Sequence, residues 1–194
     1  MYLASPPYNF PERHVSKAGQ LADQAGQPFD KTCDGILTKV LQGGLIALLG
    51  DRGTGKTQAA VEVVGRFLSH WRPPAEDSNG WRPHPTRYFV AGDLFLDLRT
   101  AMQAGSERDT LKAVKTVGLL VIDEVQERGQ TEYEDRVLVN IIDARYGNYR
   151  PTILIGNLKP DEFVRQLGPS IASRMTEGAS GVVMFTGPSH RRPS

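Results

Sequence analysis

The sequence predicts an α/β fold in which a five-stranded parallel sheet lies between two layers of helices. Two observations support this prediction. Short apolar runs suited to buried strands alternate with longer segments whose apolar residues recur at helical spacing. A glycine-rich stretch, Gly50 to Thr57, stands between the first apolar run and the helical segment after it, where a strand would turn directly into a helix. Parallel strands need helical crossovers, so the alternation favours a three-layer sandwich.

The glycine-rich stretch reads GDRGTGKT and fits the phosphate-binding pattern G-x-x-x-x-G-K-[ST]. Its flanks, an apolar run at 45–49 and a helical pattern at 58–68, argue against a chance match. Such a loop and the helix N-terminus after it direct backbone N–H groups at phosphate oxygens. Lys56 is expected to reach the β- and γ-phosphates of a nucleoside triphosphate, and the Thr57 hydroxyl to hold Mg²⁺. The residues expected to contact the nucleotide here are Gly50, Asp51, Arg52, Gly53, Thr54, Gly55, Lys56, Thr57 and Gln58.

Composition excludes several classes of protein. A chain of 194 residues with a net charge of +1 fits one domain without a strong overall field, so any nucleic acid would bind through a local patch. Cys33 is the only cysteine, which excludes an intramolecular disulfide and a multi-cysteine zinc site, and we expect it to be buried and inert. No apolar run approaches the length of a membrane span and no signal-peptide core is visible, so a cytoplasmic location is expected.

The segments around the glycine-rich loop can be assigned from their patterns. Residues 1–28 are weakly patterned, and a disordered tail and a short docking arm are equally open interpretations. A helix is predicted over 29–41. In the long loop at 71–86, Trp71 and Trp81 are expected to cap an edge of the core, with base stacking as the less favoured alternative.

The remainder of the chain continues the alternation of strands and helices. In order, the pattern predicts a strand at 87–91, a helix from Asp93 that ends before Gly105, a helix at 107–115, a strand at 119–122, a helix at 133–146, a strand at 151–155, helices at 160–167 and 170–175, and a strand at 182–185.

The strand at 119–122 is followed directly by Asp123 and Glu124. Ligands gather at the carboxyl ends of parallel strands, so Asp123 is expected to hold Mg²⁺ together with Thr57. Glu124, next to the metal site, can polarise a water molecule for attack on the γ-phosphate, which favours hydrolysis over transfer to a small substrate. The alternative, two surface acids after a strand, is less favoured behind a phosphate-binding loop.

Two further residues are candidates for the same site. Asn157 ends the strand at 151–155, and its amide would face the γ-phosphate if that strand lies between the phosphate-loop strand and the Asp-Glu strand; an Asx turn is the alternative. Arg174, on the short helix after it, could reach the site of a neighbouring subunit and offset charge on the γ-phosphate. From the residues alone, a solvated surface arginine is an equally good interpretation of Arg174.

From Gly50 to His190 the chain resembles the AAA+ domain of the DnaC/IstB-like ATPases, which include bacterial and phage helicase loaders. The resemblance is carried by an ordered set of segments: GDRGTGKT, LLVIDE ending at Glu124, TEYEDRVLVNIIDARY from Thr131, TILIGNL ending at Leu158, and LGPSIASRM ending at Met175.

The resemblance implies roles for individual residues. Lys56 and Thr57 match the Walker A residues, and Asp123 and Glu124 match the Walker B pair. Asn157 matches sensor 1, and Arg174 matches the arginine finger of the family. Arg191 looks like the arginine that follows the last strand and senses the nucleotide. The implied fold is a P-loop NTPase of the AAA+, ASCE type.

The resemblance also implies cofactors, partners and boundaries. ATP and Mg²⁺ are the expected cofactors, and the family assembles into ATP-dependent oligomers whose pore contacts single-stranded DNA. The expected boundaries are a tail or docking arm at 1–28, an AAA+ ATPase domain at 29–188 and a tail at 189–194. The chain departs from typical loaders by its short N-terminal part, and from typical AAA+ proteins by the absence of room for a helical lid.

The expected function is therefore an ATP-hydrolysing loader that recruits or opens a DnaB-type replicative helicase on single-stranded DNA. An IstB-like transposase helper is the alternative within the family, and a small-molecule kinase or an ATP-binding module with little turnover are alternatives from other classes. For DNA contact the sequence offers Lys112, Lys115 and the polar loop at 126–132 with Arg128.

Overall fold

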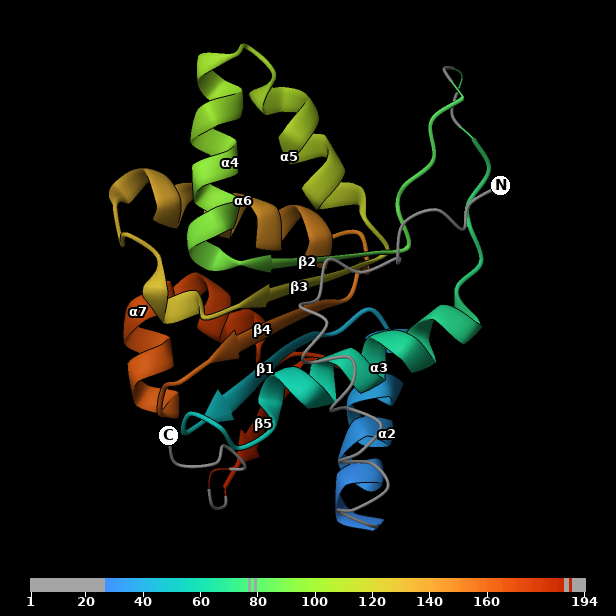
Figure 1. Ribbon diagram of the computed structural model, residues 1–194, viewed down its shortest axis with the longest axis vertical. Helices are drawn as coiled ribbons and strands as arrows, with labels where there is room; N and C mark the ends of the chain where they lie inside the picture. The colour runs from blue at the N-terminus through green and yellow to red at the C-terminus, as the bar shows by residue number, and fades with distance from the viewer. Residues whose placement is uncertain (1–26, 77, 79, 187–188, 190–194) are drawn as a thin grey trace.

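The computed structural model describes residues 27–76, 78, 80–186 and 189, and a parallel sheet occupies its centre (Figure 1). The sheet has five strands in the order β2-β3-β4-β1-β5, and all neighbours pair in parallel. The strand bounds are Leu45–Gly50 for β1, Thr86–Val90 for β2, Leu119–Asp123 for β3, Thr152–Gly156 for β4 and Gly181–Phe185 for β5. The predicted five-stranded parallel sheet is confirmed, and β4 lies between β1 and β3 as the expectation for Asn157 requires.

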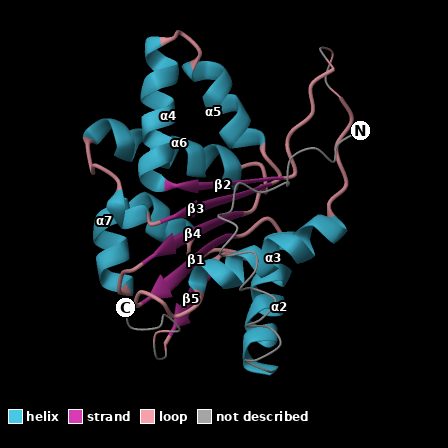
Figure 2. Cartoon of the chain, in the orientation of Figure 1, coloured by secondary structure: helices cyan, strands magenta, loops and turns pink. Residues whose placement is uncertain are grey.

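Helices cover both faces of the sheet (Figure 2). One layer contains α2 (Gln27–Leu41) and α3 (Lys56–His70), whose apolar side chains pack in one cluster with alternate strand residues such as Ile46 and Leu48. The other strand residues face a second cluster. Its helices are α4 (Ala91–Gln103), α5 (Glu107–Thr116), α6 (Glu132–Tyr146) and α7 (Pro160–Arg174). The two clusters confirm the predicted three-layer sandwich.

Most element boundaries lie within one or two residues of the prediction, and two of the differences have clear local reasons. Helix α4 begins at Ala91 instead of Asp93, because β2 pairs with β3 only as far as Val90 and the chain enters the helix directly. The two predicted helices at the end of the ATPase region form α7, and the break between them is retained at Gly168, whose backbone is non-helical (φ 81°, ψ 164°). Pro169 follows it and disfavours helical geometry in the preceding residue.

A fully buried arginine joins α6 to the starts of β3 and β4. The Arg145 guanidinium donates hydrogen bonds to the Thr152 hydroxyl and to the backbone carbonyls of Val114, Lys115, Val117, Gly118 and Pro151. Burial lowers the pKa of this guanidinium to about 9, and the nearby Arg150 adds to the effect. The bonds fix the amino-terminal edge of the sheet, opposite the edge where the candidate site lies.

The predicted arm at 1–28 lies outside the described residues except for Gln27 and Pro28, with which α2 begins. Of the predicted tail at 189–194, only Ser189 is described. No helix in the described part of the chain is long and apolar enough to cross a membrane. Cys33 is fully buried, as predicted, and burial raises the pKa of its thiol to about 12.

Candidate functional site

The candidate residues meet at the carboxyl edge of the sheet. In the sheet, β4 lies between β1 and β3 (Figure 1). The register pairs Leu49 of β1 with Gly156 of β4. Gly50 and Asn157, one residue further on, therefore leave the sheet side by side, and Asp123 ends β3 on the other side of β4. Three segments that are far apart in the sequence thus converge where ligands bind in open α/β sheets.

The glycine-rich loop has a backbone that glycine makes possible. Gly50, Gly53 and Gly55 all have positive φ, at 138°, 87° and 96°. A Cβ on Gly50 would lie 2.1 Å from the Phe185 carbonyl oxygen, so β5 also requires glycine here. Within the described part of the chain, no side chain caps the N-terminus of α3, and the first turn of α3 carries no acidic residue. The first backbone N–H groups of α3 thus remain suited to an anion.

Lys56 is held inside this loop. Its side chain is almost fully buried, and its Nζ donates hydrogen bonds to the carbonyl oxygens of Gly50 and Asp51 at 2.7 and 2.6 Å. The Thr54 hydroxyl also donates to the Asp51 carbonyl, at 2.8 Å. The loop therefore surrounds a positive charge, which is the arrangement that a polyphosphate needs.

Asp123 and Thr57 form the part of the site that fits a metal ion. The Thr57 hydroxyl lies 2.9 Å from Asp123 Oδ2, and the backbone N–H of Glu124 donates to Asp123 Oδ1 at 2.7 Å. The Tyr88 hydroxyl donates to the same Oδ2 at 3.0 Å. A carboxylate and a hydroxyl within contact distance supply the hard oxygen ligands that Mg²⁺ prefers, so the residues present fit this ion.

Glu124 points out of the sheet toward the glycine-rich loop. Its backbone is left-handed (φ 53°, ψ 45°), which turns the chain at the end of β3 into the 3₁₀ turn η1 (Val125–Glu127). The Arg52 guanidinium lies 3.6 Å from the Glu124 carboxylate and 3.3 Å from that of Glu127. Burial raises the pKa of Glu124, the carboxylates of Glu127 and Asp123 raise it further, and Arg52 opposes them. Glu124 is thus placed beside both parts of the site.

Asn157 lies where the sequence predicted it, at the end of β4. It is half-buried, and its backbone N–H donates to the Gln126 side chain at 3.1 Å, which links the end of β4 to η1. Its contribution to γ-phosphate sensing stays a prediction, as does the nucleotide-sensing role of Arg191, which lies outside the described residues.

Among the described residues, Arg174 makes its contacts within α7 and with α6, and none with the glycine-rich loop of its own chain. Its guanidinium lies 2.9 Å from the Asp143 carboxylate and donates to the carbonyl and hydroxyl of Ser170 at 2.6 and 2.7 Å. The Tyr146 ring is 5.9 Å from the guanidinium. The predicted action of Arg174 in the site of another copy of the chain stays a prediction.

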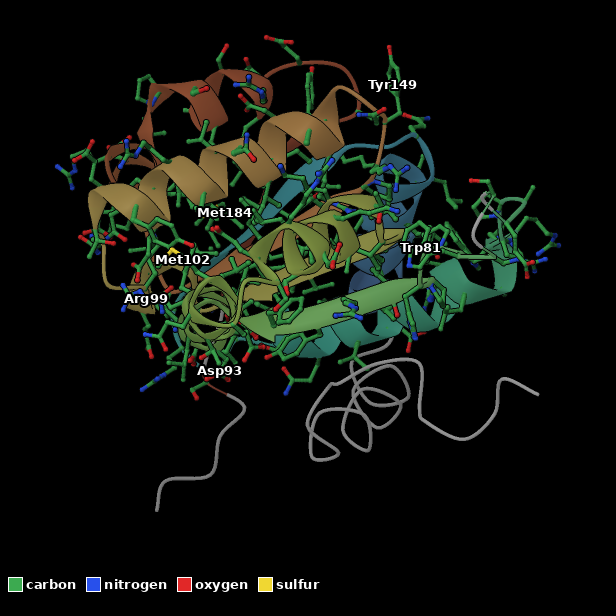
Figure 3. All side chains as sticks on the ribbon, turned by 90° about the horizontal axis from the view of Figure 1, so that it is seen from above. Trp81, Asp93, Arg99, Met102, Tyr149 and Met184 are labelled. Carbon is green, nitrogen blue, oxygen red and sulfur yellow. The ribbon has the colours of Figure 1, made fainter. Side chains whose placement is uncertain are left out.

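The predicted DNA contact through Arg128 is wrong. Arg128 is buried: its guanidinium lies 2.7 Å from the Asp135 carboxylate and also donates to the carbonyl oxygens of Val125 and Gln166, so it joins η1 to α6 and α7. The Lys112 ammonium lies 4.6 Å from the ring centre of Trp81. In Figure 3, Trp81 lies on the other side of the view from Asp93, which belongs to the first turn of α4. Contacts of DNA with Lys112 and Lys115 remain predictions.

Two residues of the site were not found from the sequence. They are Tyr88, which bonds to Asp123, and Glu127, which pairs with Arg52. The signal for Tyr88 is weak: it requires knowing that β2 pairs with β3 in the register that sets Val90 opposite Asp123. Trp71, by contrast, packs against the ring of Phe67, with ring centres 5.6 Å apart, which confirms its predicted place at an edge of the core.

Comparison with known proteins gives a family match over most of the chain. A family model described as IstB-like ATP-binding protein matches residues 37–178. The replicative helicase loader DnaC of Escherichia coli K12 is 35% identical over 144 residues, which are 73% of this chain and 54% of DnaC. The DnaC of Buchnera aphidicola subsp. Schizaphis graminum is 30% identical over 146 residues, 74% of this chain and 54% of that protein. The chain spans about half the length of the curated relatives it matches.

Solved structures share the fold. A crystal structure of the DnaC helicase loader matches with a TM-score of 0.63 at 20% identity, covering 80% of this chain and 86% of that one. AMPPCP-bound DnaA from Aquifex aeolicus matches with a TM-score of 0.63 at 19% identity, covering 80% of this chain and 44% of that one. At these identities the likeness concerns the fold alone.

Proposed function

Because the chain belongs to the IstB-like ATP-binding proteins and has the fold of AAA+ P-loop ATPases, we propose that it is a Mg²⁺-dependent ATPase that loads a DnaB-type replicative helicase onto single-stranded DNA. The observation that carries the ATPase part is the contact of the Thr57 hydroxyl with Asp123 Oδ2 at 2.9 Å, beside a loop that encloses Lys56. The similarity to DnaC supports the helicase as partner.

Each residue at the carboxyl edge has a distinct task in this proposal. The loop backbone and the N-terminus of α3 bind the phosphates, and Lys56 offsets charge on the β- and γ-phosphates. Thr57 and Asp123 hold Mg²⁺, which supplies charge stabilisation at the phosphates when bound. Glu124 accepts a proton from the attacking water. The oxygen of that water bonds to the γ-phosphorus as the bond between this phosphorus and the bridging oxygen of ADP breaks. Asn157 orients that water.

The same proposal requires more than one copy of the chain. Arg174 contacts α6 and its own helix in the single chain, and we assign it to the ATP site of the adjacent subunit, where it stabilises charge on the transferring phosphoryl group. ATP bound between subunits favours assembly because the interface gains these contacts only with the triphosphate present. The oligomer then binds single-stranded DNA more tightly with ATP than with ADP.

The test is complex formation with the replicative helicase of the host cell. The two proteins are mixed with and without a slowly hydrolysed ATP analogue and analysed by size exclusion with light scattering, with a Lys56→Ala variant as control. A joint complex that the analogue strengthens for the wild type, and not for the variant, is the expected result. Absence of a complex in both states, with intact ATPase activity, would contradict the loader function.

That contradictory result would favour a second candidate within the family. The matching family model is described as IstB-like, and an ATPase that assists a transposase through DNA is the corresponding alternative. ATP-dependent binding of the chain to duplex DNA in the absence of any helicase would support it.

A further inference from the structure

Tyr88 contacts the candidate metal site from a neighbouring strand. It lies on β2 opposite Val121 of β3, and only 7% of its surface is exposed. Its ring packs in the apolar cluster on the α2 and α3 side of the sheet, while its hydroxyl donates to Asp123 Oδ2 at 3.0 Å. A tyrosine here thus combines an apolar ring in the core with a hydroxyl directed at the end of β3.

The bond from Tyr88 completes a set of donors around the Asp123 carboxylate. Oδ2 accepts from the hydroxyls of Tyr88 and Thr57, and Oδ1 accepts from the backbone N–H of Glu124. Asp123 is itself nearly buried, at 6% exposure, so these donors replace water as its partners. The Thr57 hydroxyl belongs to a predicted metal ligand. The Tyr88 hydroxyl reaches the carboxylate from β2, which flanks β3 on the side away from β4.

We propose that Tyr88 is a positioning residue for the metal site: its hydroxyl holds the Asp123 carboxylate in the orientation in which Asp123 and Thr57 present oxygens to one Mg²⁺ ion. This inference rests on the proposed Mg²⁺–ATP function. Groups that hydrogen-bond to a ligating side chain typically change metal affinity about 10- to 100-fold when they are removed. Tyr88→Phe removes only the hydroxyl and leaves the ring in the core.

Nucleotide binding separates this role from a purely structural one. A fluorescent ATP analogue is titrated into the wild type, Tyr88→Phe and Tyr133→Phe, first in EDTA and then with increasing Mg²⁺. Tyr133 is the matched control, because its hydroxyl donates to another carboxylate, that of Glu107, at 2.9 Å between α6 and α5. Binding in EDTA also reports whether each variant is folded.

The expected result is a shift in the Mg²⁺ requirement of one variant only. Binding in EDTA should agree within about twofold for all three proteins, and Tyr88→Phe should need about tenfold more Mg²⁺ to reach half of its effect on affinity. If the wild type responds to Mg²⁺ and Tyr88→Phe needs the same Mg²⁺ concentration for half of the effect, the inference is overturned but the proposed function is not. An equal loss of affinity with and without Mg²⁺ would assign Tyr88 a structural role instead. A wild type without any Mg²⁺ response would overturn both.

Discussion

Replacing Arg145 by methionine should lower the free energy of unfolding by several kilocalories per mole. The guanidinium is fully buried and donates hydrogen bonds to one hydroxyl and to the carbonyls of Val114, Lys115, Val117, Gly118 and Pro151. Of these carbonyls, that of Pro151 also accepts the backbone N–H of Leu120 and keeps a donor in the variant. A buried carbonyl left without a donor costs about 1–3 kcal/mol. The variant no longer buries a charge, which offsets part of that loss, and we expect a net decrease of about 3–5 kcal/mol.

Urea unfolding followed by circular dichroism measures this decrease. For a chain of this size it corresponds to a fall of roughly 6–20 °C in the melting temperature. Arg136→Met is the matched control on the same helix. The Arg136 side chain is 73% exposed and pairs with Glu132 at 3.7 Å, so we expect its replacement to lower the unfolding free energy by less than about 0.5 kcal/mol. Arg145→Lys keeps the charge but has fewer hydrogen-bond donors, so its unfolding free energy should lie between those of Arg145→Met and Arg136→Met.

Equal stability of the two methionine variants would refute this reasoning. It would mean that the cost of burying the guanidinium cancels its hydrogen bonds, and that α6 is attached to the starts of β3 and β4 by apolar packing alone. Should Arg145→Met give no folded protein, the comparison of Arg145→Lys with Arg136→Met still measures the contribution.

Three further predictions concern a buried thiol, a surface ion pair and the subunit interface. Burial raises the pKa of the Cys33 thiol to about 12, so between pH 9 and 12 the thiol of the unfolded chain ionises while that of the folded chain keeps its proton. In this window the unfolding free energy of the wild type should fall relative to that of Cys33→Ala, by at most about 1.4 kcal/mol per pH unit. Parallel pH profiles of the two proteins would contradict this prediction. The Arg52–Glu127 pair is exposed, so a double-mutant cycle on unfolding free energy should give a coupling under about 1 kcal/mol; a larger value would indicate a rigid contact. Mixing Lys56→Ala with Arg174→Ala, each inactive alone, should restore about a quarter of wild-type ATPase activity, because only an intact Lys56 site facing an intact Arg174 works; no recovery would exclude action between subunits.

The parts of the site that the sequence predicted are local. The glycine-rich loop with Lys56 and Thr57 is one contiguous motif between a strand and a helix, and Asp123 and Glu124 follow a strand directly, so neighbouring residues suffice to identify them. The sheet order then placed Asn157 between them, which meets the condition on which the prediction for Asn157 depended.

The parts that were missed depend on contacts between distant segments. Tyr88 reaches Asp123 only through the register of β2 with β3. Arg128 stands in a polar segment of the sequence, which favours a place at the surface. In the folded chain it is buried by its contacts with Asp135 and with the Gln166 carbonyl of α7. Arg145 stands on a helix whose other arginine, Arg136, is solvated, and nothing in the spacing distinguishes the two. In each case the environment is set by tertiary packing, which a single sequence does not reveal.

The measurement that tests the account most directly is ATP hydrolysis by the wild type and Glu124→Gln, with ATP-analogue binding measured in parallel. Glu124 lies beside the Thr57–Asp123 pair and is the assigned general base, a role that contributes about 10²- to 10⁴-fold. The account predicts Mg²⁺-dependent hydrolysis by the wild type and a loss of at least about a hundredfold in Glu124→Gln, with binding retained. A variant that hydrolyses ATP at the wild-type rate would contradict the assignment of this edge of the sheet as the site of hydrolysis.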